Sequence, residues 1–397
     1  MNTMKLALKN ISWNGFRSLV ILLGVVGVAG FLLSTTLIIK GAEYSLDAGL
    51  ERMGADILVV PAGGEHKLET ALLMGKPIDI WMPRENVEAV AAVPGVDAVS
   101  PQVYLASLYG AACCAVWEMF MVVYDPATDF TVSPWLKENL GRDLKKGEVV
   151  GGHYISVPPE TDNIILYGYG MDLVGNLTPT GTGLDQTLFM TMETAIEMAN
   201  SSITTAVQPL SVDPKRISTI MVRTESQADV HKVALDILAQ TRGMVPIESP
   251  DLFGTFRAQM NGLLWGFFVI SLIIWTLSMF LIGLVFSMAA NERKREMAVL
   301  RAIGATRGFI FKTLVSEAAV LALAGSFIGI IIAAGGLYIL KDLIAGSLRM
   351  PFLFPSVPTF IGMFSAGIGL ALVTVTLAAF IPAFRLSRQE LAIAMRA

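Results

Sequence analysis

Charged residues are scarce in this 397-residue sequence, where Asp, Glu, Lys and Arg together make up 16%. Soluble domains carry roughly a quarter. Cysteine is nearly absent as well, with only the adjacent pair Cys113 and Cys114, which excludes a disulfide framework. Hydrophobic residues reach 54% and the mean hydropathy is +0.61. This balance excludes a disordered chain and indicates an integral membrane protein. No extended basic stretch occurs, so we expect no nucleic-acid partner.

Four long apolar runs predict transmembrane helices, because a helix needs roughly 20 apolar residues to cross a bilayer. The first run is longer than the roughly 7–15-residue core of a secretory signal and lacks a small-x-small cleavage site, so we interpret it as a retained anchor. The predicted organisation is a cytoplasmic interfacial helix at 1–18, transmembrane helices at 19–39, 263–290, 313–340 and 358–384, an extracytoplasmic domain at 41–262 with two lobes meeting near 125–147, a cytoplasmic loop at 291–312, a short extracytoplasmic loop at 341–357 and a cytoplasmic tail at 385–397.

The distribution of Lys and Arg predicts the orientation, because basic residues near the ends of spans favour the cytoplasmic side. Segments 1–18, 291–312 and 385–397 together hold 12 basic and 3 acidic residues, a balance of +9. Segment 41–257 holds 14 basic and 28 acidic residues, a balance of −14. We therefore expect both termini and the 291–312 loop in the cytoplasm, and the large domain outside.

The large segment between the first two spans has the patterning of a folded domain. Ala55–Val60 is a short buried run and Ile217–Thr224 alternates, as strands do, whereas Ser226–Thr241 has the period of an amphipathic helix. A long helix is predicted to start near Ser249–Pro250 and to run into the second span. The expected fold class is an integral membrane α-helical protein with four transmembrane helices and an inserted α+β extracytoplasmic domain.

The cytoplasmic loop 291–312 has specific helix signals. Residues 291–303 suit a helix, Gly304 suits its left-handed stop, and Thr306 suits the cap of the next helix. The run Leu300–Ala305 also places apolar and small residues where a solvent loop would be polar, which favours a protein partner. The alternative is an inert connector whose basic residues only set the orientation.

The two cysteines allow two interpretations. With Met119 and Met121 nearby, Cys113 and Cys114 offer soft sulfur ligands for Cu(I), a haem-type group or another thiophilic ligand. However, adjacent residues of a strand point to opposite faces, and a free cysteine commonly behaves as a small hydrophobe. We therefore prefer a buried strand and predict no metal site, and keep these four residues as the alternative candidate substrate or metal site.

Several segments resemble the FtsX/MacB/Lol-type permeases, which are the transmembrane subunits of one class of ABC transporter. The specific motif is ERKREMAVLRAIGATRGFIFKTLVSEAAVLALAGSFIG, starting at Glu292. ALKNISWNGFRSLVILLGVVGVA is similar to the interfacial helix and first span of that family, and GADILVVP and VEAVAAVPGVDAVSPQ are similar to the opening of its outer domain. PAFRLSRQELAIAMRA resembles its C-terminal end.

This resemblance implies that the 291–312 loop holds a coupling helix, which docks on a cytoplasmic ATPase. The residues expected to make this contact are Glu292, Arg293, Arg295, Glu296, Leu300, Arg301, Ala302, Gly304 and Ala305. The sequence contains no G-x-x-x-x-G-K-[ST] phosphate loop, so the chain cannot hydrolyse ATP alone. We expect the ATPase, with its ATP and Mg, to be a separate polypeptide, and this chain to have no catalytic site and no cofactor.

The function implied is that of a permease subunit in a prokaryotic cytoplasmic (inner) membrane, most simply for export or extraction of a hydrophobic substrate. Two ATPases need two docking loops, so a second permease chain is expected; an identical chain is favoured over a different one. The alternative is an FtsX-like mechanical transducer that regulates an extracytoplasmic protein without transport. A sensor unrelated to ABC proteins would leave the coupling motif unexplained.

Overall fold

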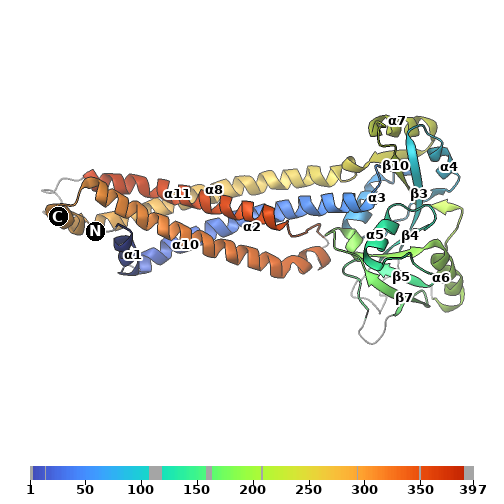
Figure 1. Ribbon diagram of the computed structural model, residues 1–397, viewed down its shortest axis with the longest axis horizontal. Helices are drawn as coiled ribbons and strands as arrows, with labels where there is room; N and C mark the ends of the chain where they lie inside the picture. The colour runs from blue at the N-terminus through green and yellow to red at the C-terminus, as the bar shows by residue number, and fades with distance from the viewer. Residues whose placement is uncertain are drawn as a thin grey trace. The chain divides into compact units, whose positions relative to one another are not determined.

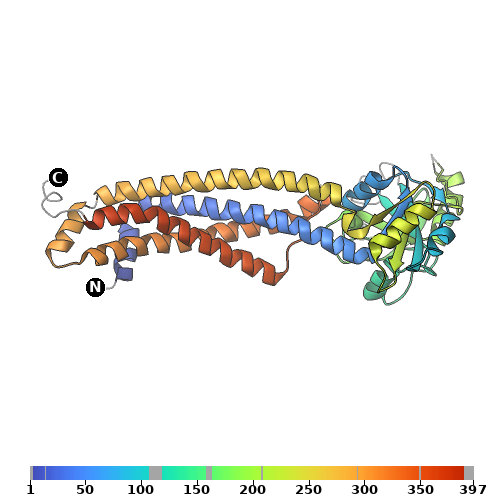
Figure 2. The ribbon, with the colours of Figure 1, turned by 90° about the horizontal axis from the view of Figure 1, so that it is seen from above.

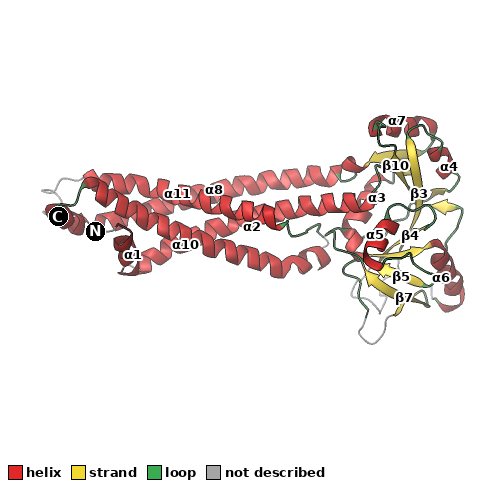
Figure 3. Cartoon of the chain, viewed as in Figure 1, coloured by secondary structure: helices red, strands yellow, loops and turns green. Residues whose placement is uncertain are grey.

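A computed structural model describes residues 3–13, 15–106, 119–157, 163–206, 209–292, 294–347 and 350–388. The chain forms two compact units. The first comprises Met1–Lys40, Asn261–Leu340 and Phe354–Ala397, and the second comprises Gly41–Met260 and Lys341–Leu353. Among the described residues every strand lies in the second unit, as Figure 3 shows.

The first unit is built from long helices that run side by side (Figure 1, Figure 2). The helices of the chain that contribute to it are α1 (Thr3–Trp13), α2 (Gly15–Met53), α8 (Gly254–Glu292), α9 (Lys294–Ala302), α10 (Arg307–Asp342) and α11 (Val357–Arg388). Four stretches are long and apolar enough to cross a membrane: Ser18–Met53, Trp265–Met288, Arg307–Gly346 and Val357–Arg385. The predicted fold, with four transmembrane helices and an α+β outer domain, is confirmed.

Helix α8 begins later than the sequence predicts. Ser249–Asp251 forms a 3₁₀ turn, and the α-helix starts at Gly254. The reason lies in the preceding strand, because the Ser249 N–H donates to the carbonyl of Asp56 at 2.9 Å. This contact continues the pairing of β11 with β1 as far as Ser249, so the sheet ends there and a 3₁₀ turn precedes the helix.

Close helix packing in the first unit depends on small residues. A Cβ added to Gly329 of α10 would lie 2.4 Å from the carbonyl oxygen of Val26 in α2, so only glycine allows this approach. Helices α8 and α11 are joined by a hydrogen bond of 2.8 Å from the Trp275 indole to the Thr374 hydroxyl. Small residues at helix contacts are the usual means of packing within lipid, where burial of apolar surface gives little drive.

The second unit contains a nine-stranded mixed sheet in the order β11-β1-β10-β3-β4-β8-β5-β7-β6. These strands are β1 (Ile57–Pro61), β3 (Val96–Ala106), β4 (Phe120–Tyr124), β5 (Glu148–Gly151), β6 (Asn163–Leu166), β7 (Tyr169–Asn176), β8 (Thr187–Thr191), β10 (Thr219–Thr224) and β11 (Met244–Glu248). A separate short pair joins β2 (Met82–Pro83) to β9 (Arg216–Ile217). Strands β4 and β8 pair in parallel at the middle of the sheet. The chain passes from the β1–β4 half to the β5–β8 half through residues 125–147, and one continuous sheet includes both halves.

Alternation along the strands sends successive side chains to opposite faces of this sheet. Ile57 and Val59 join one buried cluster, whereas Leu58 and Val60 join the other. The first cluster includes residues of α4 (Asn86–Ala91), α6 (Met192–Thr205) and α7 (Val230–Gln240). The second includes residues of α3 (Glu65–Met74), α5 (Val132–Leu140) and the Gly41–Met53 part of α2. The sheet is therefore covered on both faces.

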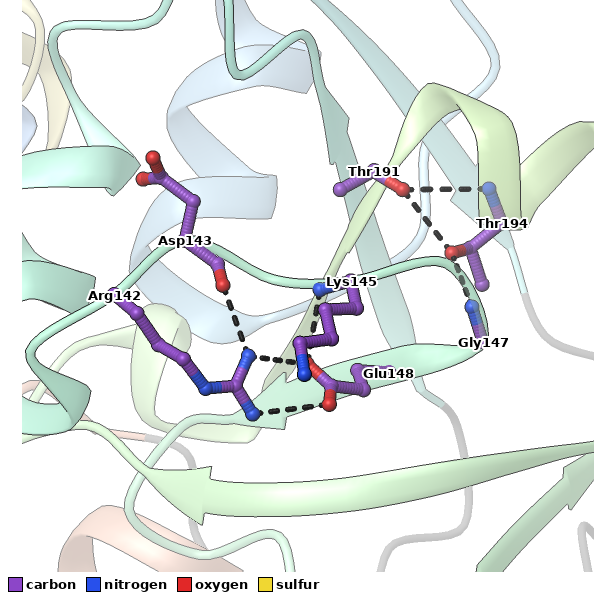
Figure 4. Close-up of polar contacts among 7 residues, drawn as sticks. All are labelled: Arg142, Asp143, Lys145, Gly147, Glu148, Thr191 and Thr194. Atoms are coloured by element: carbon purple, nitrogen blue, oxygen red, sulfur yellow. Dashed lines mark hydrogen bonds and ion pairs between the residues drawn. The ribbon is translucent and has the colours of Figure 1, made fainter.

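The turn before β5 is held by charge and by a hydrogen bond to helix α6 (Figure 4). The Arg142 guanidinium donates to both carboxylate oxygens of Glu148, at 2.6 and 2.9 Å, and the Lys145 N–H donates to the same carboxylate at 2.9 Å. The hydrogen bond from Arg142 is the main reason why the pKa of Glu148 lies below its usual range. The Gly147 N–H donates to the Thr194 hydroxyl of α6 at 3.1 Å, which ties this turn to that helix.

Candidate functional site

The predicted coupling loop forms helix α9 followed by a tight turn. The Gly304 N–H donates to the Arg301 carbonyl at 3.1 Å, and the Ala305 N–H donates to the Leu300 carbonyl at 3.0 Å. These two bonds, with Gly304 at a φ of +102°, form a Schellman motif, which satisfies carbonyls at the helix end. Glycine suits this position because other residues rarely adopt a positive φ.

The next helix starts immediately after the turn. Thr306 caps α10, since its hydroxyl accepts a hydrogen bond from the Phe309 N–H at 3.2 Å. The turn between α9 and α10 is therefore defined at both ends by local hydrogen bonds.

The residues predicted to contact an ATPase differ in their exposure. Glu292, Glu296, Ala302 and Gly304 are exposed, while Arg301 and Ala305 are half-buried. Arg293 lies outside the described residues, and so does the side chain of Arg295. The exposed members lie on α9, on its turn and at the end of α8, so the structure brings them to one end of the first unit.

Leu300 is less exposed than the sequence suggests. It is half-buried and packs against a cluster formed by Ile310, Leu314 and Ala383. Its position on the inner side of α9 fixes that helix to α10 and α11. Leu300 therefore helps to position α9 on these two helices.

Two exposed apolar side chains of α9 and its turn were not among the predicted contacts. Ile303 is 75% exposed and Val299 is 54% exposed. They are four residues apart, so they lie on one face of the helix. The sequence signal was their shared spacing, but the pattern cannot tell which apolar stripe faces the bundle and which faces outward.

The sulfur-containing candidates are only partly described. Met119 and Met121 are fully buried in the first core cluster of the second unit, which is called the outer unit below, and they pack there as hydrophobic side chains. Cys113 and Cys114 lie outside the described residues. The described part of the chain contains no group of three or more His, Cys, Asp or Glu side chains arranged to hold a metal ion.

Residues 179–187 form a structured loop that runs into strand β8 of the second unit. At its centre lies Asp185, which is 1% exposed. Its carboxylate accepts from the N–H and the hydroxyl of Thr180, at 2.8 and 2.9 Å, and from the Gly181 N–H at 2.7 Å. Burial raises the pKa of Asp185, and these hydrogen bonds act in the opposite direction. The buried carboxylate thus organises the loop from inside.

The 179–187 loop joins segments that are far apart in the sequence. The Gln186 amide donates to the carbonyls of Ala345 and Gly346, at 3.1 and 2.9 Å. The Phe352 N–H donates to the Gly181 carbonyl at 3.0 Å, and the Leu353 N–H donates to the Gly41 carbonyl of α2 at 3.1 Å. Segment 341–353, which begins with the last two residues of α10, is part of the second unit, and its described residues contact both this loop and α2.

Comparisons with known proteins agree with this architecture. The family model for the MacB-like periplasmic core domain matches residues 18–240, and the model for the C-terminal region of FtsX-like permeases matches residues 268–391. A search of curated proteins finds no match.

Solved structures also match. The periplasmic region of MacB from Actinobacillus actinomycetemcomitans aligns with a TM-score of 0.31 and 9% identity, over 52% of this chain and 95% of that chain. The extracellular domain of the ABC-type transporter YknZ from Gram-positive bacteria aligns with a TM-score of 0.27 and 11% identity, over 49% of this chain and 99% of that chain. Because the family model for the MacB-like periplasmic core domain spans more than half of the sequence, the chain belongs to the FtsX/MacB-type family of ABC transporter permeases.

Proposed function

We propose that this chain is the permease subunit of an ABC transporter, in which a separate cytoplasmic ATPase drives movement of the extracytoplasmic domain. The most direct use of this movement is the export or extraction of a hydrophobic substrate. The observation that carries the proposal is the geometry of α9, a short helix with exposed Glu296 and Ile303, locked to α10 by the Gly304 turn. An exposed apolar residue among charges is the pattern of a protein contact.

The packing of α9 supports a mechanical role. Leu300 holds α9 to Ile310, Leu314 and Ala383, so a push on the exposed face reaches α10 and α11 through direct contact. Packed cores move as units rather than deform continuously. Movement of the docked ATPase would therefore shift the ends of α10 and α11 as well as the loop.

The contacts of the outer unit support the same mechanism, because they link its sheet to the residues that follow the membrane-spanning helices. Helix α2 continues from its membrane-spanning residues to Met53, and its residue Gly41 is bonded to Leu353. The 179–187 loop holds segment 341–353 and leads directly into strand β8. Movement delivered by α2 or by the residues after α10 would reach the central strands of the sheet.

The assembly and its orientation follow from the same proposal. Each chain provides one α9, so two ATPase subunits require two permease chains, and we favour a homodimer. ATP and Mg would be bound by the partner ATPase, and this chain would supply no catalytic group or cofactor. Both termini and α9 would be cytoplasmic, and the sheet-containing unit would be extracytoplasmic, in agreement with the charge balance.

The orientation is tested with single cysteines in a chain whose Cys113 and Cys114 are replaced by Ala. Glu193→Cys and Glu296→Cys both lie at exposed positions. In intact cells an impermeant thiol reagent should label the Glu193 position only, whereas permeabilised cells should show both. Labelling of the Glu296 position alone in intact cells would reverse the orientation.

The transport function is tested with the permease and its ATPase together in nanodiscs. Small hydrophobic compounds should raise ATP turnover, and the increase should disappear when the permease is omitted. If such compounds have no effect, and an extracytoplasmic protein stably binds the permease and raises turnover instead, the transducer function replaces transport. Absence of any permease-dependent turnover would contradict both.

A further inference from the structure

An apolar groove of about 570 Å³ lies between α8 and α11. Its walls include Leu284 and Met288 from α8, and Ile381 and Pro382 from α11. Ser287 is the single polar side chain among the described lining residues. Leu284 is 60% exposed, so the groove opens away from the bundle. In a membrane-spanning unit, that opening faces lipid tails.

The groove lies where the two helices run side by side. They are joined through Trp275 and Thr374 and approach closely at Gly283, whose added Cβ would lie 3.4 Å from the Ala378 carbonyl oxygen. Pro382 has no N–H, so it cannot close the helical bond to that carbonyl. This break lies within the wall of the groove.

One charged residue lies just beyond the groove on each helix, and the two charges are opposite in sign. On α11, Ile381 is followed one turn later by the exposed Arg385. On α8, Met288 is followed one turn later by the exposed Glu292. Residues four apart in a helix share a face. Arg385 is seven residues beyond Ala378, about 10 Å, and Glu292 is nine residues beyond Gly283, about 14 Å. The cation and the anion therefore lie at similar depth, just past the apolar walls.

We propose that this groove is a binding site for a membrane phospholipid with an amine headgroup. One acyl chain occupies the apolar groove, the phosphate lies by Arg385, and the headgroup ammonium lies by Glu292. The bilayer already surrounds each tail with hydrocarbon, so affinity comes from packing in the groove and from the headgroup charges. The two charges favour a zwitterionic amine lipid over a purely anionic lipid.

The test is native mass spectrometry of the full chain, released from nanodiscs that contain equal amounts of phosphatidylethanolamine and phosphatidylglycerol. Leu284→Trp fills the groove and should lower the retained phosphatidylethanolamine about tenfold. Leu281→Trp is the matched control, because Leu281 is 64% exposed on the same helix and does not line the groove. It should retain the wild-type amount. Equal retention in wild type and Leu284→Trp, or equal loss in both variants, would overturn the proposal.

The headgroup contacts are tested separately. Arg385→Gln should lower retention of both lipids, whereas Glu292→Gln should remove only the preference for phosphatidylethanolamine. Unchanged retention and preference in both variants would contradict the assignment. If Leu284→Trp does not fold, Ile381→Trp fills the groove from α11, and Val373→Trp, which is exposed outside the groove, is its control.

Discussion

Replacing Gly304 by Val should disconnect the coupling helix from α10 while leaving the membrane helices in place. The Cβ position of Gly304 has no neighbour within 4 Å, so the first added carbon meets no clash. The damage comes from the backbone, because φ is +102°. A left-handed conformation costs a residue with a Cβ about 1–2 kcal/mol, and a β-branched side chain is worse placed there.

A turn that relaxes to avoid this strain would lose its two hydrogen bonds, from Gly304 to Arg301 and from Ala305 to Leu300. Each is worth about 0.5–1.5 kcal/mol. The cost is therefore about 1–2 kcal/mol if the turn keeps the strained conformation, or about 1–3 kcal/mol if it relaxes and loses both bonds. Either cost is enough to populate other arrangements of the turn and to weaken ATPase association by about tenfold.

The assay is copurification of the ATPase with the permease, followed by ATP turnover in nanodiscs. Gly308→Val is the matched control, since Gly308 also has open space at its Cβ position but lies in α10 without a positive φ. Gly304→Asn should restore part of the coupling, because Asn tolerates the left-handed region. We expect the order wild type and Gly308→Val first, then Gly304→Asn, then Gly304→Val.

Two results would refute this reasoning. Normal copurification and turnover in Gly304→Val would mean that the turn does not transmit force. Equal loss in Gly308→Val would mean that added bulk at this surface, and not the backbone of the turn, is what the ATPase senses.

Three further predictions concern other parts of the chain. Glu296→Lys should weaken ATPase association more at low salt than at high salt, because an exposed charge acts mainly through screened attraction; a loss independent of salt would contradict an electrostatic role. Asp185→Asn leaves one of three buried donors without an acceptor, at a cost of about 1–3 kcal/mol; hydrogen exchange of residues 179–187 in the full chain should accelerate, and unchanged exchange would refute the organising role of Asp185. The hydrogen bond to Glu248 is the main reason why the pKa of His231 is raised, so its stabilising effect should be complete below the ordinary histidine pKa and should be lost as pH rises through the raised pKa. NMR titration should show a lower pKa for His231 in Glu248→Gln than in the wild type, and no change would show that Glu248 is not the cause.

The sequence alone was enough for features governed by local chemistry. Four apolar runs long enough to span a bilayer predict four helices, because each helix satisfies its own backbone in lipid. Gly304 and Thr306 predict the end of α9 and the start of α10, since caps depend on neighbouring residues. The short apolar run Ala55–Val60 predicts a buried strand, because a strand covered on both faces of its sheet needs no alternation.

Only the tertiary structure shows which face of a helix or segment packs against which neighbour. Leu300 and Ile303 are both apolar residues of the same loop, yet Leu300 packs on Ile310 while Ile303 is exposed. Helical spacing shows which residues share one face of a helix, but not what that face packs against. The local sequence therefore cannot separate the buried residue from the exposed one. The same limit applies to segment 341–353, which the sequence treats as a loop between spans. Its hydrogen bonds to Gly181 and Gln186 cross more than 150 residues, and only the folded chain brings these groups together.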